Sequence, residues 1–311
     1  MHTKRWILAI VGPTATGKSE LGVAAARRLD GEIVNCDSMQ MIRGLSIGTA
    51  KPDAALRGAT PHHLYDRIGP QEYYSAGSYM EDSRRLCREI ADRGSIPILV
   101  GGTGLYLKVF EEGIFAGPGR SEEIRAELQA VLEAKGESFL MERLREADPE
   151  LADRISPQDH VRIVRALEVY RLSGRPMSEL QKERVPLEDF QILKAGLRLP
   201  RQVLYDRIDR RVKMMFEQGL LEEVQALLQQ GVSPDAKGCE ALGYRHAVQV
   251  VRGRMSAVDA IERTRRDTRR YAKRQLTWFR RDSKVHWIEG PGGRPETLRD
   301  LLRIWEKRHE H

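Results

Sequence analysis

Hydrophobic positions in the first hundred residues alternate between two kinds of pattern. Short apolar runs occupy residues 6–11, 32–36 and 96–100, whereas residues 18–29 and 78–93 repeat their apolar positions at helical spacing. Alternating strands and helices are typical of βαβ units, in which helices cover both faces of a parallel sheet. We therefore expect an α/β fold.

The pattern changes after the glycine-rich stretch of residues 113–119. From residue 121 to about residue 184, charged residues alternate with Leu, Ile, Val and Ala at helical spacing, and no strand pattern appears. This predicts an all-helical insertion domain over residues 116–187. The core domain would then consist of residues 1–115 and 188–311.

The chain after the insertion returns to the sheet. Residues 190–197 are predicted to form a strand and residues 202–218 a helix, and the short apolar run 285–288 fits an edge strand. Residues 61–63 read Pro-His-His, which we interpret as a surface loop. A zinc site is disfavoured there because adjacent histidines point in different directions and a third ligand in register is missing.

A phosphate-binding motif lies between the first predicted strand and the first predicted helix. It matches G-x-x-x-x-G-K-[ST] at every required position, and its residues are Gly12, Pro13, Thr14, Ala15, Thr16, Gly17, Lys18 and Ser19. In such a P-loop, backbone N–H groups and the helix N-terminus bind phosphate oxygens. The Lys18 ammonium would bridge terminal phosphates, and the Ser19 hydroxyl would hold Mg²⁺.

A nucleotide-hydrolysing P-loop enzyme usually has an acidic residue at the end of a neighbouring strand, the Walker-B position, and this chain lacks one at the end of its third strand. The strand at 96–100 runs into Gly-Gly-Thr-Gly without an acidic residue, and the nearest candidate is Asp37, directly after the second strand. At the carboxyl edge of the sheet Asp37 is placed for catalysis or metal binding. Alternatively, it forms an Asx turn or a helix N-cap. Thr103 and its flanking glycines either approach a ligand or form a tight turn.

Charge favours a polyanionic partner. The chain has 52 Lys and Arg against 45 Asp and Glu, a formal charge of +7. Arg162 and Arg165 share one helical face, and Arg207 and Arg211 share another. A solvated helix face remains the alternative for the densest run. That run comprises Arg263, Arg265, Arg266, Arg269, Arg270, Lys273, Arg274, Arg280 and Arg281.

Other features bound the environment of the protein. An apolar share of 41% is that of a globular chain. The three cysteines are far apart and predict neither a disulfide framework nor a zinc site, which fits the reducing cytoplasm. The apolar run at 6–11 is too short for a signal segment or a membrane span, and we expect no membrane partner.

Taken together, the motifs resemble those of the tRNA dimethylallyltransferases, and the resemblance spans nearly the whole chain. The segments that carry it are GPTATGKS at 12–19, DSMQ at 37–40, GTAKP at 48–52, PHHL at 61–64, GGTGLY at 101–106, RALEVY at 165–170, GYR at 243–245 and RRYAKRQLTWFR at 269–280. The resemblance implies a P-loop NTPase-like core, a dimethylallyl diphosphate donor and a tRNA acceptor, modified at the adenosine next to the anticodon. No Cys and His cluster follows Arg281, so the chain looks like the short bacterial type.

The resemblance also implies roles for individual residues. Asp37 would be the general base, and Lys18, Arg211, the P-loop amides and Mg²⁺ would stabilise the departing diphosphate. Thr103 would contact the target nucleotide, which is read by the loop of Asp37, Ser38, Met39 and Gln40. The insertion would grip the anticodon arm through Arg125, Val161, Arg162 and Arg165, although the family's usual Gln-Arg appears here as Val161-Arg162.

Three other functions are compatible with parts of the sequence. A small-molecule kinase would place ATP in the P-loop, and an adenylate isopentenyltransferase would prenylate a free nucleotide. A non-catalytic RNA-binding protein would use a nucleotide as a switch. The helical insertion and the basic C-terminal stretch favour tRNA, and we expect the protein to act as a monomer.

Overall fold

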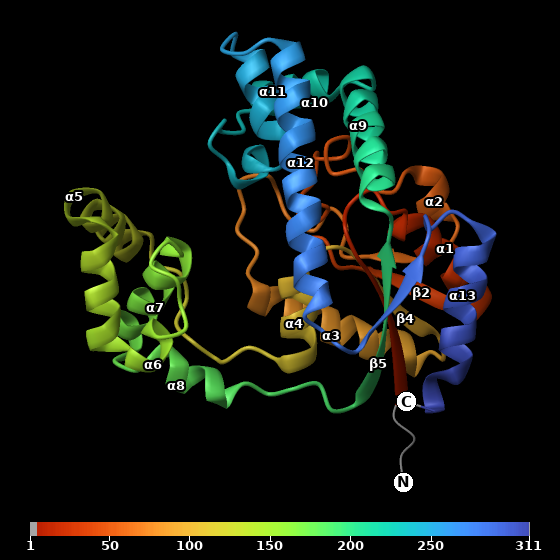
Figure 1. Cartoon of the computed structure of the whole chain (residues 1–311), viewed down its shortest axis with the longest axis horizontal. Coiled ribbons are helices and arrows are strands. Elements are labelled where there is room, and N and C mark those ends of the chain that lie inside the picture. Colours follow the sequence, from red (N-terminus) through yellow and green to blue (C-terminus); the bar gives the residue numbers. More distant parts are fainter. Residues whose placement is uncertain (1–4, 311) are drawn as a thin grey trace. The chain divides into compact units, whose positions relative to one another are not determined.

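In a computed structural model, which describes residues 5–310, six strands form one all-parallel sheet (Figure 1). Its strand order is β3-β2-β4-β1-β5-β6. The strands are β1 (Arg5–Val11), β2 (Gly31–Asn35), β3 (His62–His63), β4 (Ile96–Val100), β5 (Phe190–Arg198) and β6 (Val285–Glu289). The expected edge strand near residue 285 is present as β6, at one end of the sheet.

Helices cover both faces of this sheet, as the alternating pattern predicted. Figure 1 shows α1 and α13 on one side of it and α3 and α4 on the other. The helices of this part of the chain are α1 (Lys18–Leu29), α2 (Ala54–Gly58), α3 (Ala76–Asp92), α4 (Gly104–Glu112), α9 (Arg201–Glu217), α10 (Leu220–Gln229), α11 (Tyr244–Val251), α12 (Ala257–Arg280) and α13 (Pro295–Glu306), with 3-10 turns η2 (Lys237–Glu240) and η3 (Lys307–Glu310).

The buried positions of the central strands β1 and β4 are apolar, because both faces of the sheet are covered. In β1 the side chains alternate between faces, and Leu8 and Ile10 join a core that also contains Leu21 of α1 and Leu301 of α13. All four of these side chains are completely buried. Each buried leucine or isoleucine contributes about 1.5–3 kcal/mol, so this core fixes the helix that carries the P-loop.

A second core lies under the helices α9 to α11. Ile42 and Leu45, from the loop after β2, pack there with Leu220 and Val224 of α10 and with Tyr244 of α11. The loop that carries Ile42 and Leu45 has no regular secondary structure, so its conformation depends on this packing. The packing fixes the path of the chain between residues 42 and 50.

Residues Glu111–Leu187 form a separate compact unit, and Met1–Phe110 together with Glu188–His311 form the other. The expected insertion began at residue 116 and ended at residue 187. This unit has its own apolar core, built around Leu140, Leu144 and Ile163. Its elements are α5 (Glu122–Ala147), α6 (Pro149–Ala152), α7 (His160–Ser173), α8 (Met177–Leu180) and η1 (Gln181–Glu183).

The interpretation of His62 and His63 as a loop was wrong. They form β3, a two-residue strand that pairs with Ile33 and Val34 of β2. Two residues are too few to show a strand period in the sequence. His63 Nε2 lies 2.7 Å from Glu32 Oε2, an interaction that only the folded sheet brings about.

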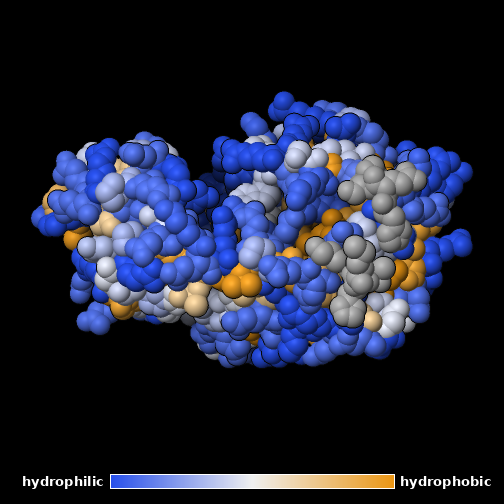
Figure 2. Space-filling model, turned by 90° about the horizontal axis from the view of Figure 1, so that it is seen from below, coloured by the Kyte–Doolittle hydropathy of each residue, from blue (hydrophilic) through white to orange (hydrophobic). Residues whose placement is uncertain are grey.

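No helix within residues 5–310 is both long and apolar enough to cross a membrane. On the face shown in Figure 2, hydrophobic residues form small separate patches within a mainly hydrophilic surface. Small apolar patches of this kind are normal for a globular surface.

The contact of the chain after β4 with the end of β2 depends on a missing side chain. A Cβ atom on Gly101 would lie 2.0 Å from the Cys36 carbonyl oxygen. We expect Gly101→Ala to lower the free energy of unfolding by about 1–3 kcal/mol or more, measured by urea denaturation. Gly293→Ala is the matched control, because a Cβ there meets nothing within 4 Å. Equal stability of the two variants would contradict this account.

Candidate active site

The P-loop joins β1 to α1 at the carboxyl edge of the sheet. Gly12 and Gly17 have φ angles of 133° and 90°, which L side chains rarely adopt. A Cβ on Gly12 would also lie 2.6 Å from the Leu197 carbonyl oxygen of β5. The two glycines of the motif are therefore required by the backbone as well as by a ligand.

Segments distant in sequence hold the P-loop backbone in place. Within the loop, Thr16 Oγ1 donates to the Pro13 carbonyl at 2.9 Å. From outside it, Arg207 Nε of α9 donates to the Ala15 carbonyl at 2.7 Å, and the Gly292 N–H donates to the Thr16 carbonyl at 2.8 Å. The carbonyls of Pro13, Ala15 and Thr16 thus accept hydrogen bonds from protein donors.

Lys18 is a partly buried cation at the start of α1. Its Nζ donates to the Pro13 carbonyl at 2.8 Å. Burial lowers the pKa of Lys18 to about 8, an effect that the nearby Asp37 carboxylate opposes and the Arg211 guanidinium reinforces. The three side chains are therefore close enough for electrostatic coupling.

Asp37 and Thr103 are brought together by the ends of β2 and β4. The Thr103 N–H donates to the Cys36 carbonyl at 3.1 Å, and Thr103 Oγ1 accepts from the Ser38 N–H at 3.1 Å. Asp37 Oδ1 accepts from the Met39 N–H at 3.0 Å, so the Asx turn considered from the sequence is present. Asp37 Oδ2 has no hydrogen-bond partner among residues 5–310, so the turn leaves one carboxylate oxygen available.

These groups open onto a cavity of about 980 Å³. It is lined by expected site residues, namely Thr14, Ala15, Gly17, Lys18, Ser19, Asp37, Gln40 and Arg211. It is also lined by residues that the sequence did not single out for the site, such as Glu20, Arg57, Arg210, Met214 and Gln218. The other expected residues of this part of the chain are not among those that line the cavity, namely Gly12, Pro13, Thr16, Ser38, Met39 and Thr103.

Gln275 of α12 is a structural link that sequence reasoning missed. Its Oε1 accepts from the Thr14 N–H at 2.8 Å, and its Nε2 donates to the Gly102 carbonyl at 2.9 Å. One buried amide therefore ties the P-loop to the turn that carries Thr103. The only signal in the sequence was its place within the motif at 269–280.

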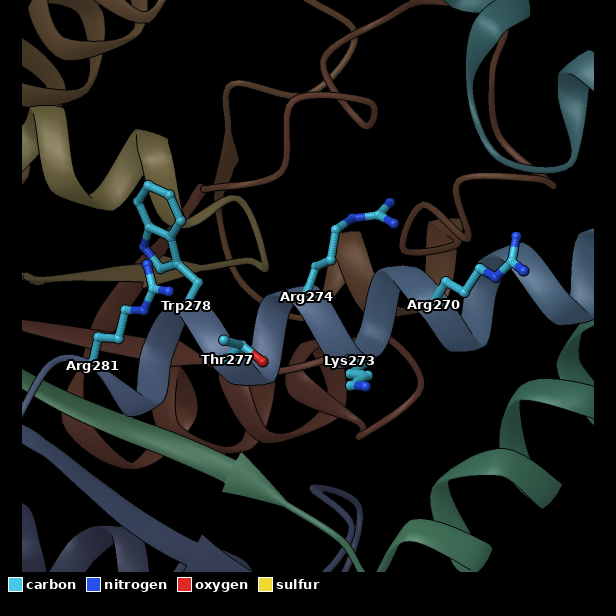
Figure 3. A pocket seen from close by; sticks show the side chains of 6 residues that line it. All are labelled: Arg270, Lys273, Arg274, Thr277, Trp278 and Arg281. Carbon is cyan, nitrogen blue, oxygen red and sulfur yellow. The ribbon is translucent and has the colours of Figure 1, made fainter. Parts of the chain in front are cut away.

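The basic residues of α12 form a smaller pocket of about 420 Å³ along one helix. In Figure 3, Arg270 and Arg274 extend from the same side of α12. Trp278 packs against the start of α4, since a Cβ on Gly104 would lie 2.2 Å from its ring. The pocket is lined by Arg270, Lys273, Arg274, Thr277, Trp278 and Arg281.

The expected tRNA contacts of the insertion fall into two groups. Arg125 and Arg165 both pair with Glu168, whose side chain is completely buried, at 2.8 and 2.6 Å. Burial alone raises the pKa of Glu168, but the hydrogen bonds from these arginines outweigh it and hold the pKa at about 2. Val161 and Arg162, at the start of α7, are 77% and 60% exposed.

Comparisons with known proteins agree with this geometry. A family model described as IPP transferase matches residues 40–282. The tRNA dimethylallyltransferase of Geobacter sulfurreducens is 47% identical over 93% of each chain. The chain belongs to the tRNA dimethylallyltransferase family. Membership confirms the resemblance seen in the sequence and makes the chain a tRNA-modifying prenyltransferase.

Solved structures of the family have the same fold. The tRNA isopentenylpyrophosphate transferase of Bacillus halodurans is 37% identical, with a TM-score of 0.71 and 99% of each chain covered. A eukaryotic dimethylallyltransferase acting on tRNA is 26% identical, with a TM-score of 0.80 over 98% of this chain and 80% of that chain. The expected α/β fold class is confirmed.

The lowered pKa of Lys18 predicts a pH effect on anion binding. A bound phosphate group favours the protonated amine, so affinity should fall as the pH rises above about 8, approaching tenfold per unit. Titration calorimetry with inorganic diphosphate between pH 7 and 9.5 measures this. Lys18→Arg is the control, because its guanidinium stays protonated throughout. Parallel curves for the two proteins would contradict the assignment.

Proposed function

We propose that this enzyme transfers the dimethylallyl group of dimethylallyl diphosphate to the exocyclic N6 amine of the adenosine 3′-adjacent to the anticodon, releasing diphosphate. The observation that supports it most directly is the cavity at the sheet edge. It combines a P-loop and the partly buried cations Lys18 and Arg211 with the carboxylate of Asp37. Family membership supplies the class of reaction.

The donor diphosphate would lie against the P-loop, with Lys18 and Arg211 as its cationic partners. Both side chains are partly buried, and this desolvation lowers the pKa of each. As the allylic C–O bond breaks, negative charge grows on the departing diphosphate. Cations held in fixed positions stabilise that charge more strongly than mobile ions in water.

Mg²⁺ fits the donor side of the cavity by its ligand chemistry. Ser19, at the start of α1, contributes a hydroxyl oxygen to the cavity. Mg²⁺ prefers oxygen ligands and often binds through one or two protein groups together with phosphates and water. When bound, the ion would neutralise diphosphate charge, and Ser19 is the residue that we propose as its ligand.

Asp37 is the proposed general base. The adenine N6 amine is a weak nucleophile, so loss of its proton must accompany formation of the new C–N bond. The nitrogen lone pair attacks the allylic carbon, the C–O bond pair leaves with diphosphate, and the N–H proton passes to Asp37. The Oδ2 oxygen is available for this because only Oδ1 is used by the Met39 N–H.

The acceptor adenosine must leave its stack to reach such a cavity. We propose that Thr103 and the loop of residues 37–40 contact it, since Thr103 Oγ1 and the Ser38 N–H already fix that loop. The basic face of α12 offers phosphate contacts, and Trp278 offers an aromatic surface. In the insertion, Val161 and Arg162 are exposed enough for direct contact with tRNA. Arg125 and Arg165 would contact tRNA while they remain paired with Glu168.

A tRNA substrate supports a cytoplasmic location, and Cys36, Cys87 and Cys239 are buried free thiols, which suits a reducing compartment.

A direct test combines the purified protein, Mg²⁺, radiolabelled dimethylallyl diphosphate and unmodified tRNA whose anticodon is followed by adenosines. Label should enter the RNA only when all four are present. ATP consumption without transfer would favour the kinase, and transfer to free adenine nucleotides but not to tRNA would favour the adenylate enzyme.

In this assay, Asp37→Asn should lower the rate of transfer by about 10²–10⁴-fold, while the dissociation constant for tRNA changes little. The amide oxygen of Asn retains the Asx turn with the Met39 N–H but takes no proton at neutral pH. Wild-type turnover in Asp37→Asn would assign Asp37 to the turn alone and sink the general-base role.

Arg162→Ala should reduce the slope of log Kd for tRNA against log salt concentration by about one, because one phosphate contact is lost. Filter binding over a range of KCl concentrations measures the slope. Arg171→Ala is the control on the same helix, since Arg171 is also exposed and paired with a carboxylate, Glu127. If the slope for Arg162→Ala equals that of the wild type, Arg162 does not contact a phosphate of the tRNA.

A further inference from the structure

One wall of the cavity is a loop held from behind by two side chains. The N–H groups of Ser46 and Ile47 each donate to the Glu223 carboxylate, at 3.1 Å to Oε2. The next N–H, that of Gly48, donates to Tyr244 Oη at 3.0 Å. Tyr244 Oη in turn donates to Glu223 Oε1. Three successive backbone donors are thus satisfied by one Glu–Tyr pair from α10 and α11.

The fit between this loop and Tyr244 is close. The Tyr244 side chain is completely buried, and a Cβ atom on Gly48 would lie 2.4 Å from its ring. Only glycine lets the loop backbone reach the hydroxyl. This contact accounts for two sequence motifs that the reaction itself does not use, the glycine of GTAKP and the tyrosine of GYR.

The other side of the same loop supports two site residues. Gln40 Nε2 donates to the carbonyls of Thr49 and Ala50 at 3.0 and 3.1 Å. Arg211 Nη2 donates to the Thr49 carbonyl at 3.4 Å. A single carbonyl therefore contacts both the residue proposed to face the acceptor nucleotide and the cation proposed to face the diphosphate.

We propose that Glu223 and Tyr244 are positioning residues that align Gln40 and Arg211 through the loop of residues 46–50. The proposal rests on the proposed function, which gives Gln40 and Arg211 their roles. Without the pair, three backbone N–H groups lose their partners, and the Thr49 carbonyl is no longer held in one place. Small displacements of reacting groups cost large factors in rate.

The competing explanation is that both residues serve only the apolar core around α10 and α11, to which Tyr244 belongs. Tyr244→Phe separates the two. It keeps the ring and its packing but removes the oxygen that joins Gly48 to Glu223. Glu223→Gln keeps the shape of that side chain but replaces one acceptor oxygen with an NH₂ group, which faces backbone donors.

Two matched controls lie outside the cavity. Tyr74→Phe removes a partly buried hydroxyl that bonds to Asp82 at 2.8 Å. Glu32→Gln disrupts a buried carboxylate held by Arg93 and His63. The full chain is used for all variants, and each is compared by thermal denaturation, single-turnover transfer with saturating donor, and the dissociation constants for tRNA and for inorganic diphosphate with Mg²⁺.

We expect Tyr244→Phe to lower the single-turnover rate about tenfold and Glu223→Gln by about tenfold to a hundredfold. Diphosphate affinity should weaken with them, because Arg211 loses its fixed position, whereas tRNA affinity should stay near that of the wild type. The controls should lower the melting temperature to a similar extent but leave rate and affinity unchanged. Gln40→Ala combined with Tyr244→Phe should cost less than the product of the two single effects.

If Tyr244→Phe has the same transfer rate and the same diphosphate affinity as the wild type, the positioning role is wrong. The proposed function still holds in that case, because the wild-type protein transfers the group. If the wild-type protein transfers no dimethylallyl group, the proposed function fails. The diphosphate titration alone then decides whether Glu223 and Tyr244 have the positioning role. Weaker binding in Tyr244→Phe than in Tyr74→Phe then supports the role, and equal binding overturns it.

Discussion

The rest of the site depends on the close approach of the chain at the carboxyl ends of β2 and β4. Parallel strands end on the same edge of a sheet, so their following loops compete for space there. Gly101 resolves this competition by bringing its backbone directly against Cys36, and the Thr103 N–H then bonds to the Cys36 carbonyl. Asp37 is the next residue in the chain, so its carboxylate and the Thr103 turn are fixed by the same contact.

Electrostatics in the cavity follow from where its cations are anchored. Arg207 is held by a P-loop carbonyl and Arg211 by the Thr49 carbonyl, so both cations are placed by neutral backbone oxygens rather than by carboxylates. A cation satisfied in this way keeps its charge available for an anionic ligand. In contrast, Arg125 and Arg165 share the buried carboxylate of Glu168, and much of their charge is already compensated inside the insertion.

Much of the fold could be predicted because its signals are local. The P-loop letters, the helix at 18–29 and the strand at 96–100 appear in the structure at those bounds. His62 and His63 were missed as a strand because only pairing with β2 defines it. Gln275, Glu223 and Tyr244 could not be assigned from sequence, since each acts through contacts with segments more than 150 residues away. The charge of Arg165 is evident from the sequence, but its pairing with Glu168 is seen only in the structure.

The bond from the Gly292 N–H to the Thr16 carbonyl has a consequence for biosynthesis. A Cβ on Gly292 would lie 2.0 Å from the Gly17 carbonyl oxygen, so the two loops are packed backbone to backbone. The P-loop comes long before Gly292 in the chain, so it is synthesised well before the residue that braces it. A nascent chain therefore carries the complete phosphate-binding motif before that motif has its final support, and the finished pocket forms only after the segment of Gly292 has been made.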